Sequence, residues 1–254
     1  MITSLKGGVG KSTVTANLAL ALAKEGRRTL AVDCDFTMRT LDLIMGHEDD
    51  VVYDICDIIR NDTPLEKAVI QDSRSENLYF CAAPYSYEGK IAPAVFGEKI
   101  RGIAEELALD CILMDTPGDS LSLLELVAAA ADRAVIIASH QPASIRAAEK
   151  TSLILDELGI EDRKMIINSF NFKAVKKGIL PGIINIIDRT YIQLIGVIPM
   201  DSRLGELQEY GALVDEIEKT NTAAAFTSIA QRICGKSLPL FYGWKPSHKS
   251  YVTK

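Results

Sequence analysis

The sequence has little of what marks several protein classes. No apolar run in its 254 residues approaches the roughly 20 needed to cross a bilayer as a helix, and no signal-peptide pattern is present. We therefore expect a cytoplasmic protein or one that binds a membrane only peripherally. The five cysteines form no C-x-C or C-x-x-C pair. Their odd number and scattered, mostly apolar positions favour reduced core residues over disulfides.

Acidic residues are missing from the end of the chain. No Asp or Glu follows Glu218, so the last 36 residues carry +6, whereas the first 218 carry −12 from 22 basic and 34 acidic residues. The net charge of −6 gives no reason to expect nucleic-acid binding by the whole molecule. The asymmetry predicts one domain over residues 1–235 and a basic, aromatic tail, 236–254, with a partner of its own.

Strand-like apolar runs alternate with helical patterns almost to the end of the chain. Strands are expected at 1–5, 28–33, 77–83, 111–115, 134–138, 164–168 and 194–198, and helices at 12–24, 41–45, 51–60, 98–107, 121–131, 144–158, 183–190, 202–210 and 220–234. Continuous apolar strands separated by helices predict an α/β fold of three layers, in which helices cover both faces of a mostly parallel sheet. The first strand is short for one that should lie mid-sheet.

A glycine- and lysine-rich octet follows the first predicted strand. It reads Lys6-Gly7-Gly8-Val9-Gly10-Lys11-Ser12-Thr13. The glycines allow a tight turn whose N–H groups point inward and bind anions, and the N-terminus of the next helix adds partial positive charge. A lysine and a hydroxyl at this spacing suit a phosphate chain and its magnesium ion, which predicts a P-loop. A glycine-rich turn with incidental lysines is the alternative.

The octet departs from the strict P-loop pattern, because Leu5 stands where the first glycine belongs and Lys6 adds a second lysine. This variant resembles the deviant Walker A motif of the MinD/ParA family of ATPases, and the resemblance covers about residues 1–215. It implies an ATP hydrolase that binds ATP and Mg²⁺ and forms a homodimer when ATP binds. In that family the extra lysine, here Lys6, reaches the partner's nucleotide. A solvated Lys6 is the alternative.

The resemblance implies a role for each residue of the octet. Lys11 and the loop amides of Gly7, Gly8, Val9 and Gly10 would hold the phosphates. Ser12 would bind Mg²⁺ directly, and Thr13 would contact the α-phosphate. Phosphoryl transfer requires positioning and neutralisation of charge rather than covalent chemistry. The catalytic roles are therefore electrostatic, and they fall on Lys6, Lys11 and Asp35.

Two predicted strands end in aspartate, at the edge where parallel α/β sheets bind ligands. Asp115 follows three apolar residues, a Walker B arrangement, and is expected to hold Mg²⁺ through its water shell. Gly118 then lies where a switch loop would offer its N–H to the γ-phosphate. An aspartate that only caps a loop is the alternative.

Asp33 and Asp35 form the second acidic pair. Because strand residues alternate between faces, both carboxylates are expected to point toward the phosphates. The resemblance gives Asp35 the position that orients the attacking water beside the metal, and a purely structural Asp33 is the alternative. The following residues, 38–46 and 51–54, look like the MinD branch of the family rather than the ParA branch.

Recognition of the base is expected at two further strand ends. The family often places an asparagine that hydrogen-bonds the purine where Asn168 stands, and Pro199 with its two successors would line the other side of the base. Turn chemistry is the alternative, because Asn and Pro-x-Asp close strands routinely.

The partners are less defined, because the segment 139–146 departs from the family. Gln141 stands where Pro-Glu is usual, and Ala147 and Ala148 stand where the MinD branch has an acidic residue in its partner-binding surface. We expect a regulatory or cargo protein without naming it.

The tail contains aromatic residues suited to a membrane surface, namely Phe241, Tyr242 and Trp244. However, Pro239, Gly243 and Pro246 interrupt any helix that could lie in the interface. Packing back on the domain, or disorder, is therefore favoured over peripheral membrane contact.

The resulting hypothesis is an ATP-driven dimerisation switch that organises the cell in space, for example by placing the division site. One alternative is a ParA-like partitioning ATPase that binds DNA, which the acidic body disfavours. Another is a metal-cluster carrier or a biosynthetic, amide-forming relative. The carriers generally use paired cysteines at the dimer axis, and this sequence has none.

Overall fold

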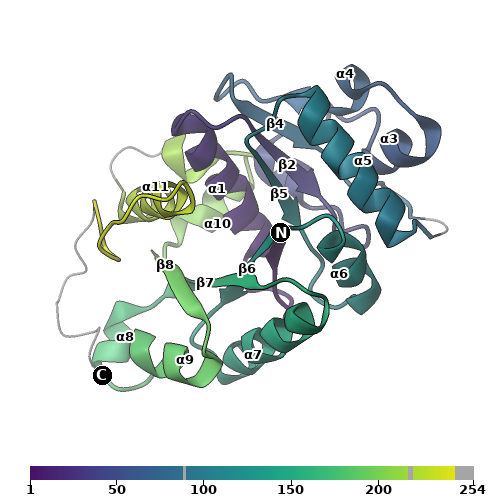
Figure 1. Ribbon diagram of the computed structural model, residues 1–254. Helices are drawn as coiled ribbons and strands as arrows, with labels where there is room; N and C mark the ends of the chain where they lie inside the picture. The colour runs from purple at the N-terminus through teal and green to yellow at the C-terminus, as the bar shows by residue number, and fades with distance from the viewer. Residues whose placement is uncertain (88–89, 217–219, 244–254) are drawn as a thin grey trace.

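The computed structural model describes residues 1–87, 90–216 and 220–243. Within them one sheet runs in the order β3-β4-β2-β5-β1-β6-β7-β8 (Figure 1). The strands are β1 Ile2–Thr3, β2 Thr29–Asp33, β3 Ile70–Gln71, β4 Leu78–Cys81, β5 Cys111–Asp115, β6 Arg133–Ala138, β7 Asp162–Phe170 and β8 Gln193–Pro199. Among the strands of the described residues, only the edge strand β3 pairs antiparallel with its neighbour. The predicted mostly parallel sheet is confirmed.

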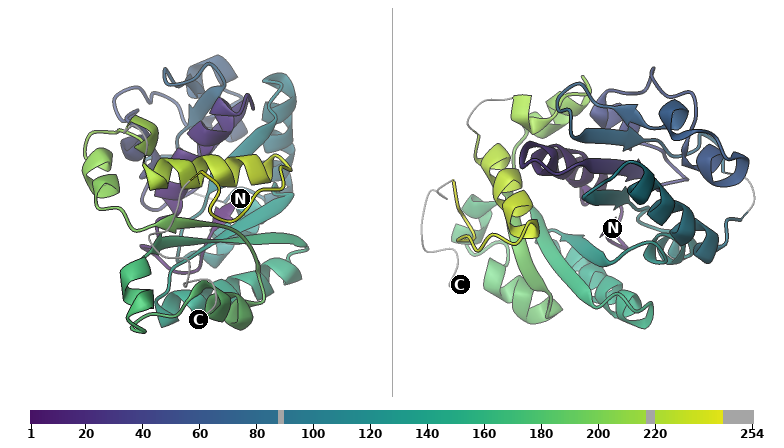
Figure 2. Two further views of the ribbon diagram at one scale, coloured as in Figure 1. Left: turned by 90° about the vertical axis from the view of Figure 1, so that its left-hand side faces the viewer. Right: turned by 45° about the horizontal axis from the view of Figure 1, so that its top comes forward.

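Helices cover both faces of this sheet (Figure 2). They are α1 Lys11–Lys24, α2 Leu41–Met45, α3 Ile55–Asn61, α4 Leu65–Ala68, α5 Pro93–Glu106, α6 Leu121–Ala128, α7 Pro142–Glu157, α8 Phe172–Lys176, α9 Ile183–Thr190, α10 Arg203–Gln208 and α11 Asn221–Ile233. One buried cluster joins α1, α2 and α11 to the sheet, and the other joins α3, α5, α6, α7 and α9 to it. Adjacent residues of a strand belong to different clusters: Ala31 packs in the first cluster and Val32 in the second. The three-layer prediction is confirmed.

The helix predicted at 51–60 begins later, at Ile55, because of a capping box. The side chain of Asp54 accepts hydrogen bonds from the N–H groups of Cys56 and Asp57, and the Asp57 carboxylate accepts one from the Asp54 N–H. This exchange satisfies the free donors of the first turn, so it defines where the helix starts. The prediction missed the short elements β3, α4 and α8 altogether.

The first strand is shorter than predicted, and a cavity lies beside it. Ile2 of β1 lies opposite Asp115 of β5 on one side and Val135 of β6 on the other. The residues of β5 that precede Asp115 therefore extend beyond Met1. A cavity of about 630 Å³ opens there, at the amino ends of the strands. It therefore lies at the opposite end of the strands from the octet.

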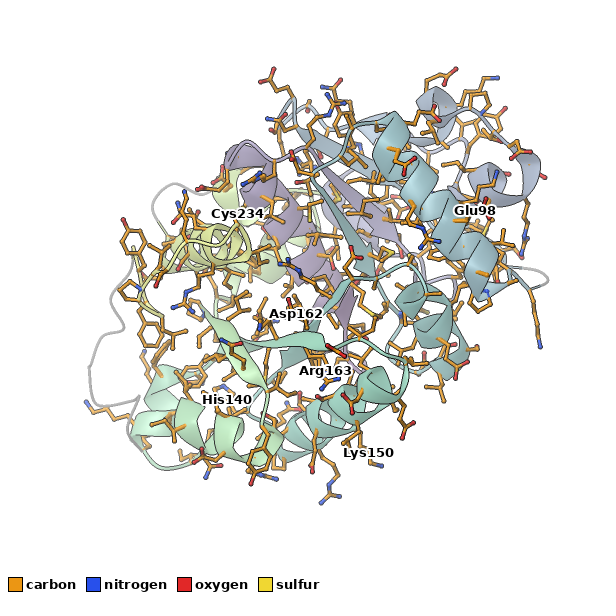
Figure 3. The ribbon with its side chains drawn as sticks, viewed as in Figure 1. Glu98, His140, Lys150, Asp162, Arg163 and Cys234 are labelled. Atoms are coloured by element: carbon orange, nitrogen blue, oxygen red, sulfur yellow. The ribbon has the colours of Figure 1, made fainter. Side chains whose placement is uncertain are left out.

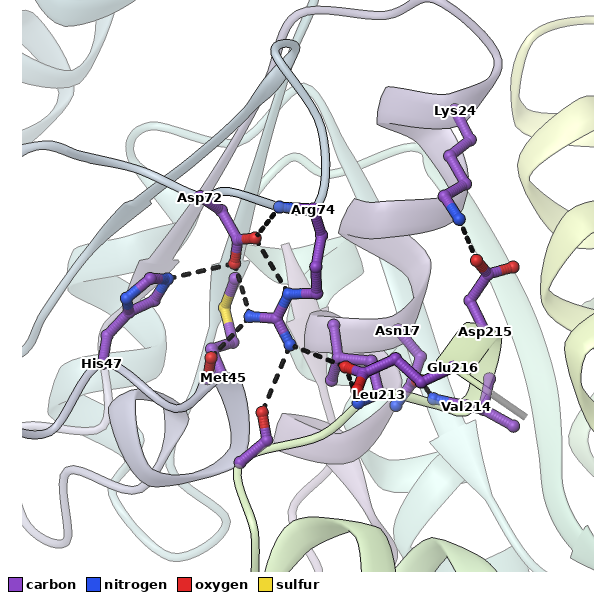
Figure 4. A network of polar contacts seen from close by, with 11 residues as sticks. Asn17, Lys24, Met45, His47, Asp72, Arg74, Leu213, Val214, Asp215 and Glu216 are labelled. Carbon is purple, nitrogen blue, oxygen red and sulfur yellow. Dashed lines mark hydrogen bonds and ion pairs between the residues drawn. The ribbon is translucent and has the colours of Figure 1, made fainter.

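A buried ionic network joins the segment 211–216 to α2 and to the turn between β3 and β4 (Figure 4). The Arg74 guanidinium binds the carboxylate of Asp72 and donates to the carbonyl oxygens of Met45 and Gly211. Nε2 of His47 lies 3.0 Å from Asp72 Oδ2, and this hydrogen bond raises the pKa of His47. Burial opposes ionisation of Asp72, but His47 and Arg74 outweigh it and hold the pKa of Asp72 well below its usual range.

Replacing Asp72 by asparagine is expected to lower the free energy of unfolding by about 3 kcal/mol, because removal of one partner leaves a largely buried Arg74 charge uncompensated. Urea denaturation measures the change. The matched control is Asp156→Asn. Asp156 is 64% exposed in its ion pair with Arg163, so its loss should cost under about 0.5 kcal/mol. Equal losses in the two variants would contradict the assigned role of the network.

Candidate functional site

The predicted site residues gather where the carboxyl ends of β1, β2, β5, β7 and β8 meet. The octet connects β1 to α1, which begins at Lys11, one residue before the predicted start. Gly8 and Gly10 have φ angles of 71° and 88°, in the left-handed region that favours glycine. A Cβ atom on Gly10 would come within 2.4 Å of Asn168 Nδ2. The loop therefore needs glycine both for its turn and for close packing beneath it.

Lys11 is a buried cation, only 8% exposed. Burial lowers its pKa, although the charges of Asp115, Asp35 and Asp119 oppose that change. Within the described residues no carboxylate hydrogen-bonds or ion-pairs with its ammonium. A buried charge without a partner is costly, so this position suits a bound anion such as a phosphate.

Gly118 lies directly against the octet. A Cβ atom added to it would stand 2.8 Å from the amide nitrogen of Gly7 and 3.0 Å from Lys11 Nζ. Only glycine therefore lets the loop after β5 approach the lysine so closely. This places the backbone of Gly118 beside the predicted phosphate position.

Asp115 is fully buried at the end of β5. Its Oδ1 accepts a hydrogen bond of 3.1 Å from Thr15, whereas Oδ2 has no partner in the part of the chain described. Burial raises the pKa of Asp115, and the nearby Ser12 hydroxyl and Lys11 ammonium oppose the increase. An orphaned carboxylate oxygen near the Ser12 hydroxyl, which accepts a 3.3 Å hydrogen bond from Thr40 Oγ1, suits a hydrated Mg²⁺ ion. The donor set therefore fits magnesium.

Asp33 and Asp35 both hold the loop that leads to α2. Asp33 Oδ2 accepts from the amides of Thr40 and Leu41 at 3.1 and 3.0 Å, which is the structural role weighed as its alternative. Asp35 Oδ1 accepts from the amides of Thr37 and Met38, both at 3.1 Å. Because β2 ends at Asp33, strand alternation does not reach Asp35. The Asp35 carboxylate thus accepts hydrogen bonds from the loop that directly follows it, at the edge of the site.

Asp33 also lies opposite Asp115 in the register of β2 and β5. Burial, and then the negative charge of Asp115, raise the pKa of Asp33. Two neighbouring buried carboxylates repel one another, so a cation between them and the solvent would relieve the repulsion. This is a second reason why a divalent cation suits the site.

Of the two residues predicted to bind the base, Pro199 ends its strand as expected, whereas Asn168 does not, because β7 continues past an irregularity to Phe170. Asn168 is 6% exposed and donates from Nδ2 to the carbonyl oxygen of Val9 at 2.9 Å, so it packs against the octet. Pro199 is half-buried and ends β8. Their contacts with a base stay predictions.

Two polar residues of the site were missed by sequence reasoning. Thr15 could have been found, because a threonine four residues after the lysine faces the same side of the helix. Gln208 could not: its Nε2 donates to Thr13 Oγ1 at 2.5 Å, but 195 residues separate the two.

The segment that departs from the family is anchored to β7. His140, which Figure 3 labels, is buried. Its Nε2 accepts a hydrogen bond of 2.9 Å from the Asn171 N–H, and its ring lies 4.6 Å from that of Phe170. Burial lowers the pKa of His140. The neutral ring is thus a structural support, and Gln141 beside it is exposed at the start of α7.

The described part of the tail lies on the domain. The ring of Phe241 is 6.0 Å from that of Phe172, and Leu240 also packs against the core. Tyr242 is half-exposed, residues 235–243 form no helix, and Trp244 lies outside the described residues. Nowhere in the described chain is a helix long and apolar enough to cross a membrane. All five cysteines are free, as predicted.

Comparisons with known proteins agree with this geometry. Residues 1–214 match the family model described as the CobQ/CobB/MinD/ParA nucleotide binding domain. The chain is 31% identical to the septum site-determining protein MinD of Bacillus subtilis, over 94% of this chain and 90% of that protein. It is 34% identical to MinD of Helicobacter pylori, over 93% and 90%.

Solved structures give the same result. A chain of the MinC:MinD cell division protein complex from Aquifex aeolicus superposes with a TM-score of 0.87 at 33% identity, covering 94% of this chain and 96% of that one. MinD complexed with Mg-ADP from Pyrococcus horikoshii superposes with a TM-score of 0.80 at 28% identity, covering 91% and 93%. On its sequence, its fold and its phosphate-binding loop, the chain belongs to the CobQ/CobB/MinD/ParA family of nucleotide-binding domains.

Proposed function

We propose that this protein is a MgATP-hydrolysing switch that dimerises when it binds ATP, and that it serves division-site selection or a related positioning task. The observation that carries the proposal is the buried, unpaired Lys11 ammonium beside the orphaned carboxylate oxygen of Asp115. One position lacks an anion and the other lacks a cation. A magnesium–nucleotide complex supplies both.

The proposed roles follow from position. The loop amides of residues 7–10 and the ammonium of Lys11 bind the β- and γ-phosphates, and Gly118 offers its N–H to the γ-phosphate. Ser12 and Asp115 would hold Mg²⁺, directly and through water, and the ion would neutralise phosphate charge. Asp35 would turn from its own loop to align the attacking water near the metal. Asn168 would hydrogen-bond the base, and Pro199 would line its other side.

The process and the partners are proposed from the relatives. The similar proteins are named for septum-site determination, and one of them was solved with MinC. A regulatory protein partner is therefore proposed here, with its identity left open because of the altered segment 139–146. We also propose that residues 1–235 form the ATPase domain and that 236–254 form an accessory tail.

The function is tested by measuring hydrolysis of MgATP at increasing protein concentration. The rate per molecule should rise as dimers form, and light scattering should find a dimer with MgATP and a monomer with MgADP. A rate that stays constant, with one mass in both nucleotides, would argue against a dimerisation switch. Sedimentation with DNA and with anionic vesicles, for the full chain and for residues 1–235, separates partitioning from membrane recruitment.

Replacing Asp35 by alanine is expected to trap the ATP-bound dimer. The variant keeps every proposed phosphate ligand but loses the group that aligns water, so turnover should fall by about a hundredfold or more. Gel filtration with MgATP should then show a dimer that persists for hours. The matched control is Asp49→Ala, at an exposed position outside the site. Wild-type turnover in the Asp35 variant would remove this residue from the mechanism.

A further inference from the structure

The Thr13 hydroxyl and Gln208 form a contact between α1 and α10 at the nucleotide site. Gln208 is half-buried, and its Nε2 donates to Thr13 Oγ1. A hydroxyl carries one hydrogen and two acceptor lone pairs. The amide occupies a lone pair of Thr13, so the single hydroxyl hydrogen must point elsewhere.

That hydrogen is kept from its usual acceptor. Threonine in a helix commonly donates to the carbonyl four residues earlier, as Thr15 does to Lys11 at 3.0 Å and Thr190 does to Ile186 at 2.9 Å. For Thr13 this carbonyl belongs to Val9, which precedes the N-cap residue Gly10 and lies outside the helix, and the described residues show no hydrogen bond from Thr13 to it. No acceptor for the Thr13 hydroxyl occurs among the described residues.

Gln208 is held in place without any nucleotide. Three residues later, Gly211 packs so closely on α2 that a Cβ atom on it would stand 2.4 Å from the Cα atom of Gly46. Arg74 donates to the Gly211 carbonyl oxygen at 3.2 Å (Figure 4). The N–H of Val214 donates to Asn17 Oδ1, one turn beyond Thr13 on α1, at 2.8 Å. The amide of Gln208 is therefore presented to Thr13 by a fixed segment.

We propose that Gln208 is a positioning residue that aims the Thr13 hydroxyl hydrogen at a phosphate oxygen of the bound nucleotide. The proposal rests on the proposed function. An oriented hydroxyl donates to the phosphate without first giving up a hydrogen bond within the protein. This pre-organisation should favour ATP and ADP equally, because both carry the phosphate nearest the ribose.

The test measures Kd for MgATP and MgADP by calorimetry in Gln208→Leu and Gln208→Glu. The leucine variant should bind both nucleotides about tenfold more weakly, the value of one hydrogen bond to a charged group. The glutamate variant should lose more, because a carboxylate accepts the Thr13 hydrogen and also repels the phosphates. In a Thr13→Ala background the Gln208→Leu penalty should shrink to less than about twofold. The matched control is Gln231→Leu, which removes a 2.7 Å hydrogen bond to Glu25 at the other end of α1 and should leave Kd unchanged.

The outcomes separate this inference from the proposed function. Wild-type protein that binds neither nucleotide would overturn both. Wild-type binding together with an unchanged Kd in Gln208→Leu would overturn the positioning role alone. The same would follow if the Gln208→Leu penalty were equally large with and without Thr13, because a purely structural effect would not depend on that hydroxyl.

Discussion

Lys11→Ala protein should bind MgATP and MgADP at least about a hundredfold more weakly than the wild type, because a buried lysine that contacts two phosphates makes several charge-assisted hydrogen bonds. The same substitution should not destabilise the free protein. Lys11 is buried without an ion-pair partner in the described chain, so removing its charge relieves a desolvation cost that offsets the lost attraction to Asp115. Loss of binding and retention of stability together identify a ligand-binding lysine.

The measurement is thermal unfolding of each protein with and without MgADP. Wild-type Tm should rise by about 6 °C at a ligand concentration of about 100 Kd, because binding to the native state alone stabilises it. Lys11→Ala should rise by no more than about 1 °C, because the same concentration is at most about one Kd of the variant, and its starting Tm should equal or exceed that of the wild type. The control Lys67→Ala, at an exposed position on α4, should behave like the wild type. A Lys11 variant that melts several degrees lower without ligand, yet still responds to MgADP, would contradict the assignment.

The fold and the centre of the site could be predicted because their signals are local. The eight residues of the octet are contiguous in the sequence, and β5 ends at Asp115, which directly follows three apolar residues. The helix predicted from Ser12 to Lys24 is observed as Lys11–Lys24, one residue longer at its start. A glycine lies close to each of its ends. The family resemblance, carried by the same residues, is confirmed by the match over residues 1–214.

The parts that escaped prediction depend on contacts between distant residues. The structural role of Asp33 needs the amides of Thr40 and Leu41, which the loop brings back to it. Gln208 reaches Thr13 from a segment in which Gly211 packs on Gly46, far along the chain from α1. Asn168 was expected to end its strand, but β7 continues to Phe170, and the Asn168 amide donates to the distant Val9 carbonyl. Periodicity reports which face a residue occupies, and it carries no information about which distant group it meets there.

Lys6→Ala should separate nucleotide binding from dimerisation. The Lys6 side chain is half-buried on the octet, and within the described residues no acidic group pairs with it. Lys11, Gly118 and Asp115 do not depend on it for their positions, so MgATP should bind the variant within about threefold of the wild type. If the Lys6 ammonium contributes to the partner's nucleotide site, the Lys6→Ala variant should no longer form the ATP-dependent dimer. Turnover should then fall by about a thousandfold, the scale of a positive charge supplied in trans.

Mixing two inactive variants tests whether Lys6 acts across the dimer. Lys6→Ala and Asp35→Ala should each bind MgATP. In a mixed dimer the Lys6→Ala subunit keeps its own Asp35 and receives Lys6 from its partner, so one complete site is restored. Turnover that reappears only in the mixture, and is absent when the Asp35→Ala partner also carries Lys6→Ala, would establish action in trans. A Lys6→Ala protein that dimerises on its own with MgATP would refute a shared site, because the proposed interface charge would then be dispensable.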